Sequence, residues 1–134
     1  VSTTETADRK AFCMHLPDRK RKESIMAIDK SLISGSTTML LLKLLSEKDM
    51  YGYEMIEELK KRSENIFALK AGTLYPLLHG MEDKGLLTCY EQEFQGKTRK
   101  YYSITGKGHK ELQTRKNSWQ EYSRAVAGVL CYGV

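Results

Sequence analysis

The chain has 134 residues, of which 40% are hydrophobic and 29% are charged, and its net charge at neutral pH is +5. This length suits one domain with a modest core, and the absence of any run of about 18 apolar residues excludes a transmembrane helix. The N-terminus also lacks the apolar segment of a signal peptide, so we expect a cytoplasmic protein.

The amino-terminal residues 1–27 differ in character from the rest of the chain. They are polar, contain the basic run Arg19–Lys22 and show no hydrophobic period, which predicts a disordered basic tail. Lys22–Ser24 can be encoded by codons that resemble a bacterial ribosome-binding site. We therefore hypothesise that Val1 is a misassigned start and that the native protein begins at Met26. A native basic arm that contacts DNA, or contacts nothing, is the alternative.

Two helices are predicted in the first half of the chain. Residues 28–46 have a helical pattern, and Met39–Leu45 is apolar almost all round apart from Lys43. Such a helix is buried on more than one side, so in a chain this short we expect another subunit to cover part of it. Tyr51–Arg62 predicts the second helix, after a polar turn in which Asp49 is the expected N-cap.

The stretch Lys70–Gly85 predicts a third helix. Its apolar residues follow the i, i+3, i+4, i+7 pattern along one face: Leu74, Leu77, Leu78 and Met81. Because proline has no N–H, Pro76 places the helix start near Gly72–Thr73, and Gly85 suits its end. The exposed start includes Tyr75 and no acid, so it can approach a phosphate backbone without repulsion. An ordinary amphipathic helix is the alternative.

After this helix the hydrophobic period changes from 3.6 to 2. Residues 87–92 and 101–104 alternate as strands do, and the segment Phe94–Thr98 between them is a glycine-containing loop. From Phe94 to Lys116 the chain carries seven Lys or Arg residues and only one acid. This charge pattern suits an anionic polymer, although a solvated charged face would also account for it.

A long closing helix is predicted after Thr105–Gly108. Its apolar residues recur at seven-residue spacing in two series: Leu112, Trp119 and Val126, and Tyr122 and Val129. The rest of the chain offers this stripe nothing to pack against, so we expect it to pair with a second subunit. We expect the apolar helix at Met39–Leu45, including Leu41, to complete the interface.

The predicted fold is mostly α with a small β-hairpin. Three helices, a two-stranded ribbon and a final helix indicate a winged helix-turn-helix domain over residues 28–105, followed by a dimerisation helix and C-terminal tail over residues 106–134. In this arrangement Lys70–Gly85 is the recognition helix and Phe94–Thr98 is the wing.

The side chains do not favour catalysis. His15, His79 and His109 lie in the tail, on the proposed DNA-facing side and at a basic helix start, without a nearby nucleophile or paired carboxylate. We therefore expect neither an enzyme nor a cofactor. A winged helix that binds only proteins is the alternative function, and its binding would depend little on salt.

The three cysteines, Cys13, Cys89 and Cys131, are widely spaced. Their spacing matches no metal-ligand pattern, so we expect no metal site. We interpret them as reduced thiols, with a redox-sensing thiol as the alternative.

Three segments resemble the PadR family of bacterial transcriptional regulators: YGYEMIEELKKRS, GTLYPLLHGMEDKGLL and GKTRKYYSITGKGHKEL, in this order. The resemblance covers about residues 28–130. Family members are winged-helix homodimers that repress transcription and respond to small effectors, and a single-helix arm is similar to the compact subgroup. The resemblance implies a sequence-specific repressor that a small molecule releases from DNA. Two-fold symmetry implies an inverted-repeat operator in double-stranded DNA.

The expected DNA contacts come from three elements. They are Tyr51 and Tyr53 at a helix start; Lys70, Thr73, Tyr75, Pro76 and His79 on the recognition helix; and Lys97, Arg99 and Lys100 in the wing. Basic side chains neutralise phosphates, and tyrosine hydroxyls hydrogen-bond them. Base-edge readout would rest on Thr73 and His79, so much of the specificity could come from DNA shape.

Trp119, the only tryptophan, is the expected effector-binding residue, with Tyr122 beside it. Near a two-fold axis, two facing indoles could sandwich a planar aromatic compound. Multidrug-responsive members of the compact PadR subgroup resemble this arrangement. The alternative is that Trp119 only fills the dimer core.

Overall fold

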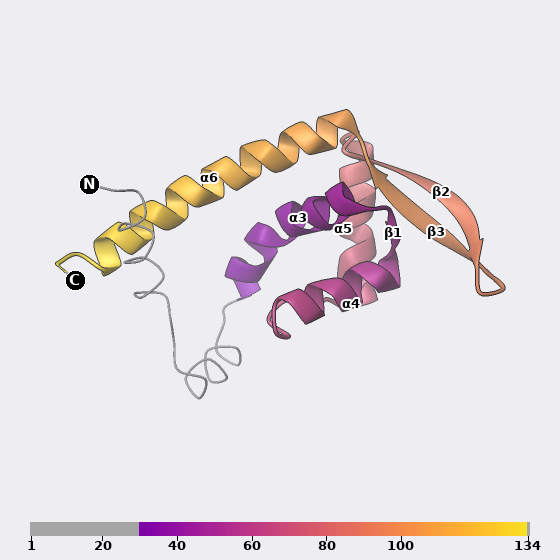
Figure 1. The fold of residues 1–134 in the computed structure, drawn as a ribbon, viewed down its shortest axis with the longest axis horizontal. Helices are drawn as coiled ribbons and strands as arrows, with labels where there is room; N and C mark the ends of the chain where they lie inside the picture. The colour runs from indigo at the N-terminus through magenta and orange to yellow at the C-terminus, as the bar shows by residue number, and fades with distance from the viewer. Residues whose placement is uncertain (1–29, 134) are drawn as a thin grey trace. The chain divides into compact units, whose positions relative to one another are not determined.

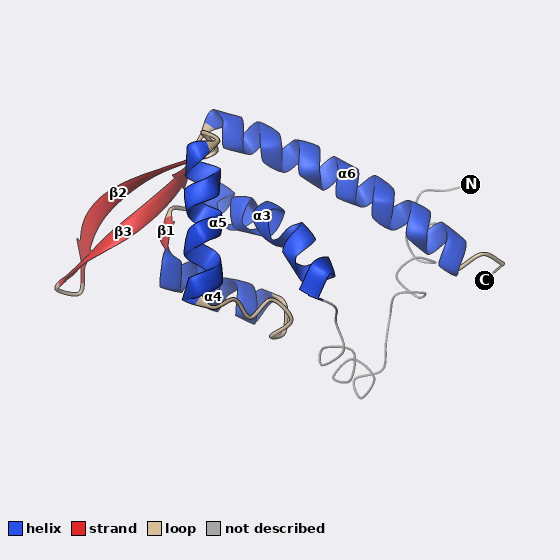
Figure 2. Cartoon of the chain, turned by 180° about the vertical axis from the view of Figure 1, so that it is seen from behind, coloured by secondary structure: helices blue, strands red, loops and turns tan. Residues whose placement is uncertain are grey.

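The computed structural model describes residues 30–133, with side chains from Ser36 onward (Figure 1). Its elements are, in chain order, α3 (Lys30–Glu47), β1 (Met50–Tyr51), α4 (Gly52–Arg62), α5 (Ala71–Asp83), β2 (Leu87–Phe94), β3 (Lys97–Ile104) and α6 (Gly106–Leu130). Three helices, a hairpin and a long final helix confirm the predicted winged helix-turn-helix fold (Figure 2). The predictions about residues 1–27, including Cys13, His15 and the Met26 start, lie outside the described residues.

The chain divides into two compact units. Residues 28–114 belong to one unit, and Arg115 and the residues after it belong to the other. The α6 helix continues from the first unit into the second without a break.

The sheet has three antiparallel strands in the order β1-β3-β2. The prediction of a two-stranded ribbon is therefore incomplete, because Met50 pairs with Tyr102 and Tyr51 pairs with Tyr101. A strand of two residues is too short to show a period of two in the sequence. This short strand matters for the site, since it attaches the hairpin to the residues that begin α4.

The hairpin turn is tighter than the sequence predicts. Phe94 pairs with Lys97, so only Gln95 and Gly96 form the turn. Both have positive φ angles, of 52° and 78°, as a type I′ turn requires. The predicted loop Phe94–Thr98 is therefore too long. Phe94 is the last residue of β2, and Lys97 and Thr98 already belong to β3.

Leucines of α3 occupy the centre of the core. Leu41, Leu42, Leu44 and Leu45 are each at most 2% exposed, and they join buried residues from the other elements: Met55, Leu74, Leu78 and Tyr102. The helix is therefore apolar all round largely because its own domain surrounds it. A fully buried side chain offers no surface to a partner, so the assignment of Leu41 to the subunit interface is wrong.

The junction between β3 and α6 is held by Thr105. Its hydroxyl accepts a hydrogen bond from the Gly108 N–H at 3.0 Å and donates toward the carbonyl oxygens of Gly85 and Leu86. Thr105 is thus an N-cap for α6. Gly108 lies so close to Leu86 and Ile104 that a Cβ atom there would overlap both residues. The glycine lets the first turn of α6 rest directly on the chain that follows α5.

Candidate nucleic-acid interface

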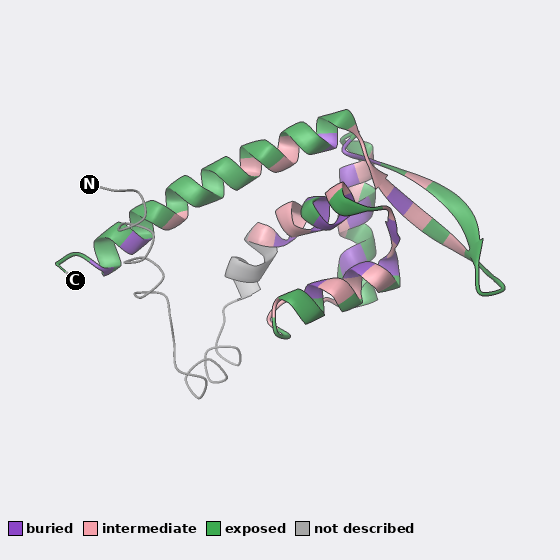
Figure 3. Ribbon diagram, in the orientation of Figure 1, coloured by how far each residue is buried: buried purple, intermediate pink, exposed green. Residues whose placement is uncertain are grey.

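The α5 helix has one buried face and one exposed face (Figure 3). Leu74, Leu78 and Met81 are buried, as predicted. The exposed residues are Ala71, Gly72, Thr73, Tyr75, Pro76, His79 and Asp83. Every residue predicted to contact DNA on this helix is therefore accessible to solvent, and the first turn carries no acidic side chain.

The α5 helix begins at Ala71, with Lys70 as its N-cap. The predicted start near Gly72–Thr73 is late by one to two residues. Pro76 therefore lies inside the helix and not in its first turn. Because proline has no N–H, Pro76 cannot donate the usual helical hydrogen bond to the carbonyl of Gly72. Because Ala71 and Gly72 are small and exposed, the backbone at this end of the helix is open to a close partner.

The end of α5 follows the prediction at Gly85. This residue has a φ of 77°, and its N–H donates to the Glu82 carbonyl while the Leu86 N–H donates to the Met81 carbonyl, both at 2.9 Å. These two bonds form a Schellman motif. Met81 and Leu86 are both buried, so the motif also anchors the helix end to the core.

Tyr75 connects α5 to the start of α4. Its side chain is 40% exposed, yet its ring lies against Gly52 so closely that a Cβ atom on Gly52 would be 2.8 Å from the ring carbon Cζ. Any larger residue at position 52 would displace the ring. The sequence reasoning missed Gly52; a glycine between two tyrosines at a helix start was the available signal.

Tyr51 is the N-cap of α4, and its N–H donates to the Glu54 carboxylate at 3.3 Å. The prediction that Asp49 caps this helix is wrong. The Asp49 carboxylate instead accepts a hydrogen bond from the Tyr90 hydroxyl at 2.7 Å, and this bond raises the pKa of Tyr90. Tyr53, in the first turn of α4, is exposed as expected of a backbone contact.

The strand register separates the three predicted wing cations. Successive strand residues point to opposite faces, and the inner face carries the buried Leu87 and Tyr102. Lys100 shares this inner face, and its ammonium lies 5.6 Å from the centre of the Tyr102 ring. Lys97 and Arg99 point to the outer face. These three residues therefore do not form one cluster.

Charge is also divided between the two faces of the hairpin. On the outer face, β2 and β3 contribute no acid: the residues are Thr88, Tyr90, Gln92, Phe94, Lys97, Arg99, Tyr101 and Ser103. The two acids of the hairpin, Glu91 and Glu93, share the inner face with Lys100. Only the outer face of the hairpin is therefore free of acidic residues from β2 and β3.

Aromatic rings cover the outer face. The Tyr90 and Tyr101 rings stack with centroids 5.7 Å apart, and the Tyr51 ring meets Tyr101 edge-on at 5.4 Å. The Arg99 guanidinium lies over the Tyr51 ring, 4.4 Å from its centre. We call these residues, together with Phe94, the outer-face cluster. Alternation along β2 and β3 could have placed its hairpin residues on one face from the sequence, but it could not have added Tyr51.

On the inner face, Cys89 is a free thiol that donates a hydrogen bond to the Glu82 carboxylate of α5 at 3.0 Å. This bond is the main cause that raises the pKa of the Cys89 thiol. The prediction of reduced thiols is wrong for Cys131, which is disulfide-bonded.

The second half of α6 exposes its large apolar residues, whereas Ala127 is buried. Trp119 is 49% exposed, Tyr122 68% and Val129 78%, and Val126 is also exposed. Leu112 differs, because it is half-buried against the core of the first unit. Large exposed apolar residues that recur along one helix are typical of an interaction surface.

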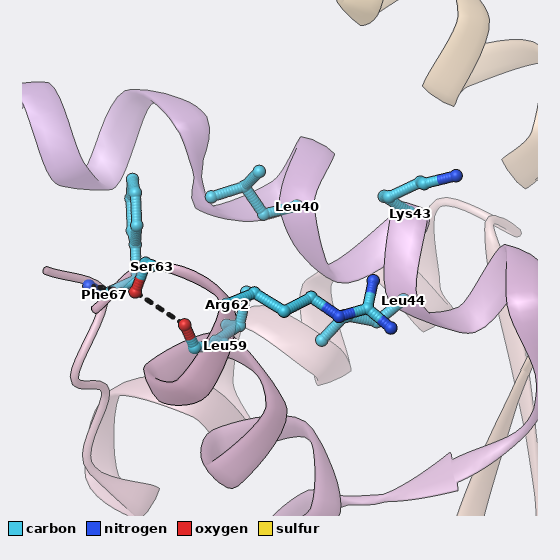
Figure 4. Close-up of a pocket in the computed structure, with 7 residues that line it drawn as sticks. All are labelled: Leu40, Lys43, Leu44, Leu59, Arg62, Ser63 and Phe67. Atoms are coloured by element: carbon cyan, nitrogen blue, oxygen red, sulfur yellow. Dashed lines mark hydrogen bonds between the residues drawn. The ribbon is translucent and has the colours of Figure 1, made fainter. Parts of the chain in front are cut away.

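A hollow of about 270 Å³ opens between α3 and α4 (Figure 4). Leucines and Phe67 line it, with Lys43 and Arg62 at its edge. Arg62 binds the Glu47 carboxylate through two nitrogens, at 2.6 and 3.0 Å, and also binds Glu58 at 2.7 Å. These bonds raise the pKa of Arg62 and lower that of Glu47. The arginine thus joins the ends of α3 and α4, and its charge is already neutralised.

Neither a metal site nor a membrane span is found in residues 30–133. No group of three His, Cys, Asp or Glu side chains within that range lies together as metal binding requires. None of the helices there has both the length and the apolarity needed to cross a bilayer.

Comparison with known proteins identifies the family. Residues 41–114 match the model of the transcriptional regulator PadR-like family. A PadR-like regulator from Bacillus cereus is 32% identical, with a TM-score of 0.68 over 75% of this chain and 96% of its own. A PadR family regulator from Clostridium difficile is 34% identical, with a TM-score of 0.64 over 71% and 98%. An uncharacterized protein of Lysinibacillus sphaericus is 33% identical over 74% of this chain and 92% of its own. The chain therefore belongs to the PadR-like family of transcriptional regulators.

Proposed function

We propose that this regulator binds double-stranded DNA as a homodimer and represses transcription from an inverted-repeat operator in the bacterial cytoplasm. The observation that carries the proposal is the exposed start of α5, which has no acid and lies next to the start of α4 through the Tyr75–Gly52 contact. In a helix-turn-helix the second helix enters the major groove while the first touches the backbone. Thr73, Pro76 and His79 would then face base edges, and Tyr53 and Lys70 would meet phosphates.

The wing adds a second contact to each half-site. Lys97 adjoins the hairpin turn on the acid-free outer face, so it can reach a phosphate without repulsion from neighbouring carboxylates. Lys100 lies on the opposite face, close to the Tyr102 ring, and its contribution would come from the inner side of the hairpin. The two lysines are therefore expected to contact DNA at different places.

The test is the salt dependence of operator binding. An operator would be selected from random duplex DNA, and the dissociation constant would be measured by fluorescence anisotropy between 50 and 200 mM salt. Lys97→Ala should weaken binding to every sequence and reduce the slope of log K against log salt by ~0.9, the value for one lost phosphate contact. Thr73→Val or His79→Ala should reduce operator preference while leaving nonspecific binding unchanged.

Lys43→Ala is the matched control, because it removes one positive charge from α3, where the lysine pairs with Glu47. Its slope should equal that of the wild type. Binding that does not depend on salt would reject the DNA-binding proposal and favour a winged helix that binds proteins.

The homodimer is proposed to form through the second half of α6. Exposed Trp119, Tyr122, Val126 and Val129 support this, since they recur along one helix and would be costly to leave in water. Val126→Glu should give monomers in analytical ultracentrifugation and abolish specific operator binding. An exposed charge change on the same helix, Lys116→Glu, is the control. A tight dimer in Val126→Glu would show that the interface lies elsewhere.

Release by an effector is proposed to involve Trp119 and Tyr122. Two half-exposed indoles facing across a two-fold axis would bind a planar aromatic compound between them. Release then requires the compound to bind one dimer state more tightly than the other. The test is to titrate planar cationic and phenolic compounds while measuring Trp119 fluorescence and operator release together. Quenching that is equal in the Val126→Glu monomer would refute the sandwich.

A further inference from the structure

The guanidinium of Arg99 stacks against aromatic rings of the protein. Its central carbon lies 4.4 Å from the centre of the Tyr51 ring and 5.8 Å from that of Phe94. Its Nε is buried and has no hydrogen-bond partner among the described residues. A planar, weakly hydrated guanidinium is well suited to stack on rings in this way. The two rings therefore give the Arg99 charge a favourable contact on a face to which β2 and β3 contribute no acid.

Tyr51 belongs to two elements at once. As part of β1 it pairs with Tyr101 of the hairpin, and as the N-cap of α4 it donates its N–H to Glu54. Any group fixed to the Tyr51 ring is therefore fixed to the start of the helix-turn-helix. Arg99 lies in β3, two residues from the hairpin turn's last flanking residue, Lys97.

The base of the hairpin packs in the core through Leu87 and Tyr102, and residues 49–51 form a second connection nearer the turn. The β1 strand offers two residue pairs, and β2 reaches the same region through the Tyr90 hydroxyl, which donates to Asp49. The outer-face cluster adds side-chain contacts between the hairpin and residues 49–51.

From these contacts we infer that Arg99 and Tyr51 position the wing relative to the helix-turn-helix, and that neither contacts DNA phosphates through its charge or hydroxyl. This inference rests on the proposed DNA-binding function. It replaces the expectation that Arg99, like Lys97, contacts a DNA phosphate. The two residues share a face of the hairpin, but only Arg99 is covered by rings.

The experiment compares four variants of the full-length protein. Arg99→Met removes the charge but keeps much of the length, and Arg99→Lys keeps the charge but loses the planar group. Tyr51→Leu removes the ring, and Tyr51→Phe removes only the hydroxyl. We expect Arg99→Met, Arg99→Lys and Tyr51→Leu each to weaken operator binding by about 5–30-fold, with a salt slope equal to that of the wild type. Tyr51→Phe should bind like the wild type.

A double-mutant cycle adds an independent criterion. If Arg99 and Tyr51 act through each other, Arg99→Met should cost little more in a Tyr51→Leu background, so their effects will not add. A slope reduced by ~0.9 in Arg99→Met, together with rescue by Arg99→Lys, would show a phosphate contact and overturn the inference. Additive losses would overturn it as well.

Hydrogen exchange of the free protein separates this inference from the proposed function. In Arg99→Met and Tyr51→Leu the amides of β2 and β3 near the turn should exchange faster than in the wild type, whereas Lys97→Ala should leave them unchanged. If the wild type failed to bind DNA, the proposed function would fail while this measurement still tested the positioning role. Unchanged exchange in both variants would overturn the inference whatever the DNA result.

Discussion

The close contact at Gly108 makes a sharp prediction for stability. In Gly108→Ala the new Cβ would lie 2.6 Å from Ile104 Cγ1 and would overlap the Leu86 carbonyl oxygen, whereas ordinary contacts span 3.4–4 Å. Overpacking of this kind costs about 1–3 kcal/mol. The carbonyl also accepts bonds from the Thr105 N–H and hydroxyl, so moving it away weakens hydrogen bonds worth about 1 kcal/mol each.

A gain of up to about 1 kcal/mol in helix propensity partly offsets this cost. We expect a net loss of about 2–3 kcal/mol, which lowers the Tm of a chain of this size by roughly 8–15 °C. Differential scanning calorimetry at one protein concentration would measure the change. The matched control is Gly80→Ala, since a Cβ at this helical glycine meets nothing within 4 Å. Its Tm should rise by a few degrees, and a Gly108→Ala protein that melts within about 2 °C of the wild type would refute the reasoning.

Three further predictions follow from the contacts described above. Gly52→Ala should push the Tyr75 ring aside and weaken operator binding about tenfold. In a Tyr75→Ala background Gly52→Ala should not weaken operator binding further. An equal loss of affinity in both backgrounds would contradict the proposed contact between the two residues. Arg62 lowers the pKa of Glu47 below its ordinary 4.5, so the stability that this carboxylate contributes is present above that value and lost as the pH falls through the lowered pKa. The Tm difference between the wild type and Glu47→Gln should therefore be largest near neutral pH and vanish in acid, whereas a difference that is constant from pH 2.5 to 7 would argue against the ion pair. Because Glu82 raises the pKa of the Cys89 thiol, Glu82→Gln should speed alkylation of Cys89 by iodoacetamide at pH 8; an unchanged rate would exclude this hydrogen bond in solution.

Local patterns were sufficient to predict most of the fold. The spacing of leucines on α5, the positive-φ glycine at its end and the alternation of the hairpin are all properties of residues near one another in the chain. The short strand β1 was missed because two residues cannot show a period. The N-cap at Asp49 was wrong because the helix begins after a strand pair that forms with residues about 50 positions away.

The candidate site was less accessible to sequence reasoning. Grouping Lys97, Arg99 and Lys100 by charge ignored strand alternation, which places Lys100 on the other face. The stacking of Arg99 on Tyr51 and the approach of Tyr75 to Gly52 join segments that are distant in the chain, so the local pattern could mark these residues but could not show which of them meet. Leu41 was misassigned because an all-round apolar helix can be covered by its own domain or by a partner, and composition does not distinguish the two.

The hydrogen bonds of Thr105 attach the first turn of α6 to the residues that follow α5. Thr105 donates to the carbonyls of Gly85 and Leu86, which are the residues that immediately follow the last turn of α5 and its cap. The α6 helix has 25 residues, which corresponds to a length of about 37 Å. Its first turn is attached to the C-terminal end of α5. Because Gly108 has no side chain, this first turn of α6 packs directly on the backbone of Leu86.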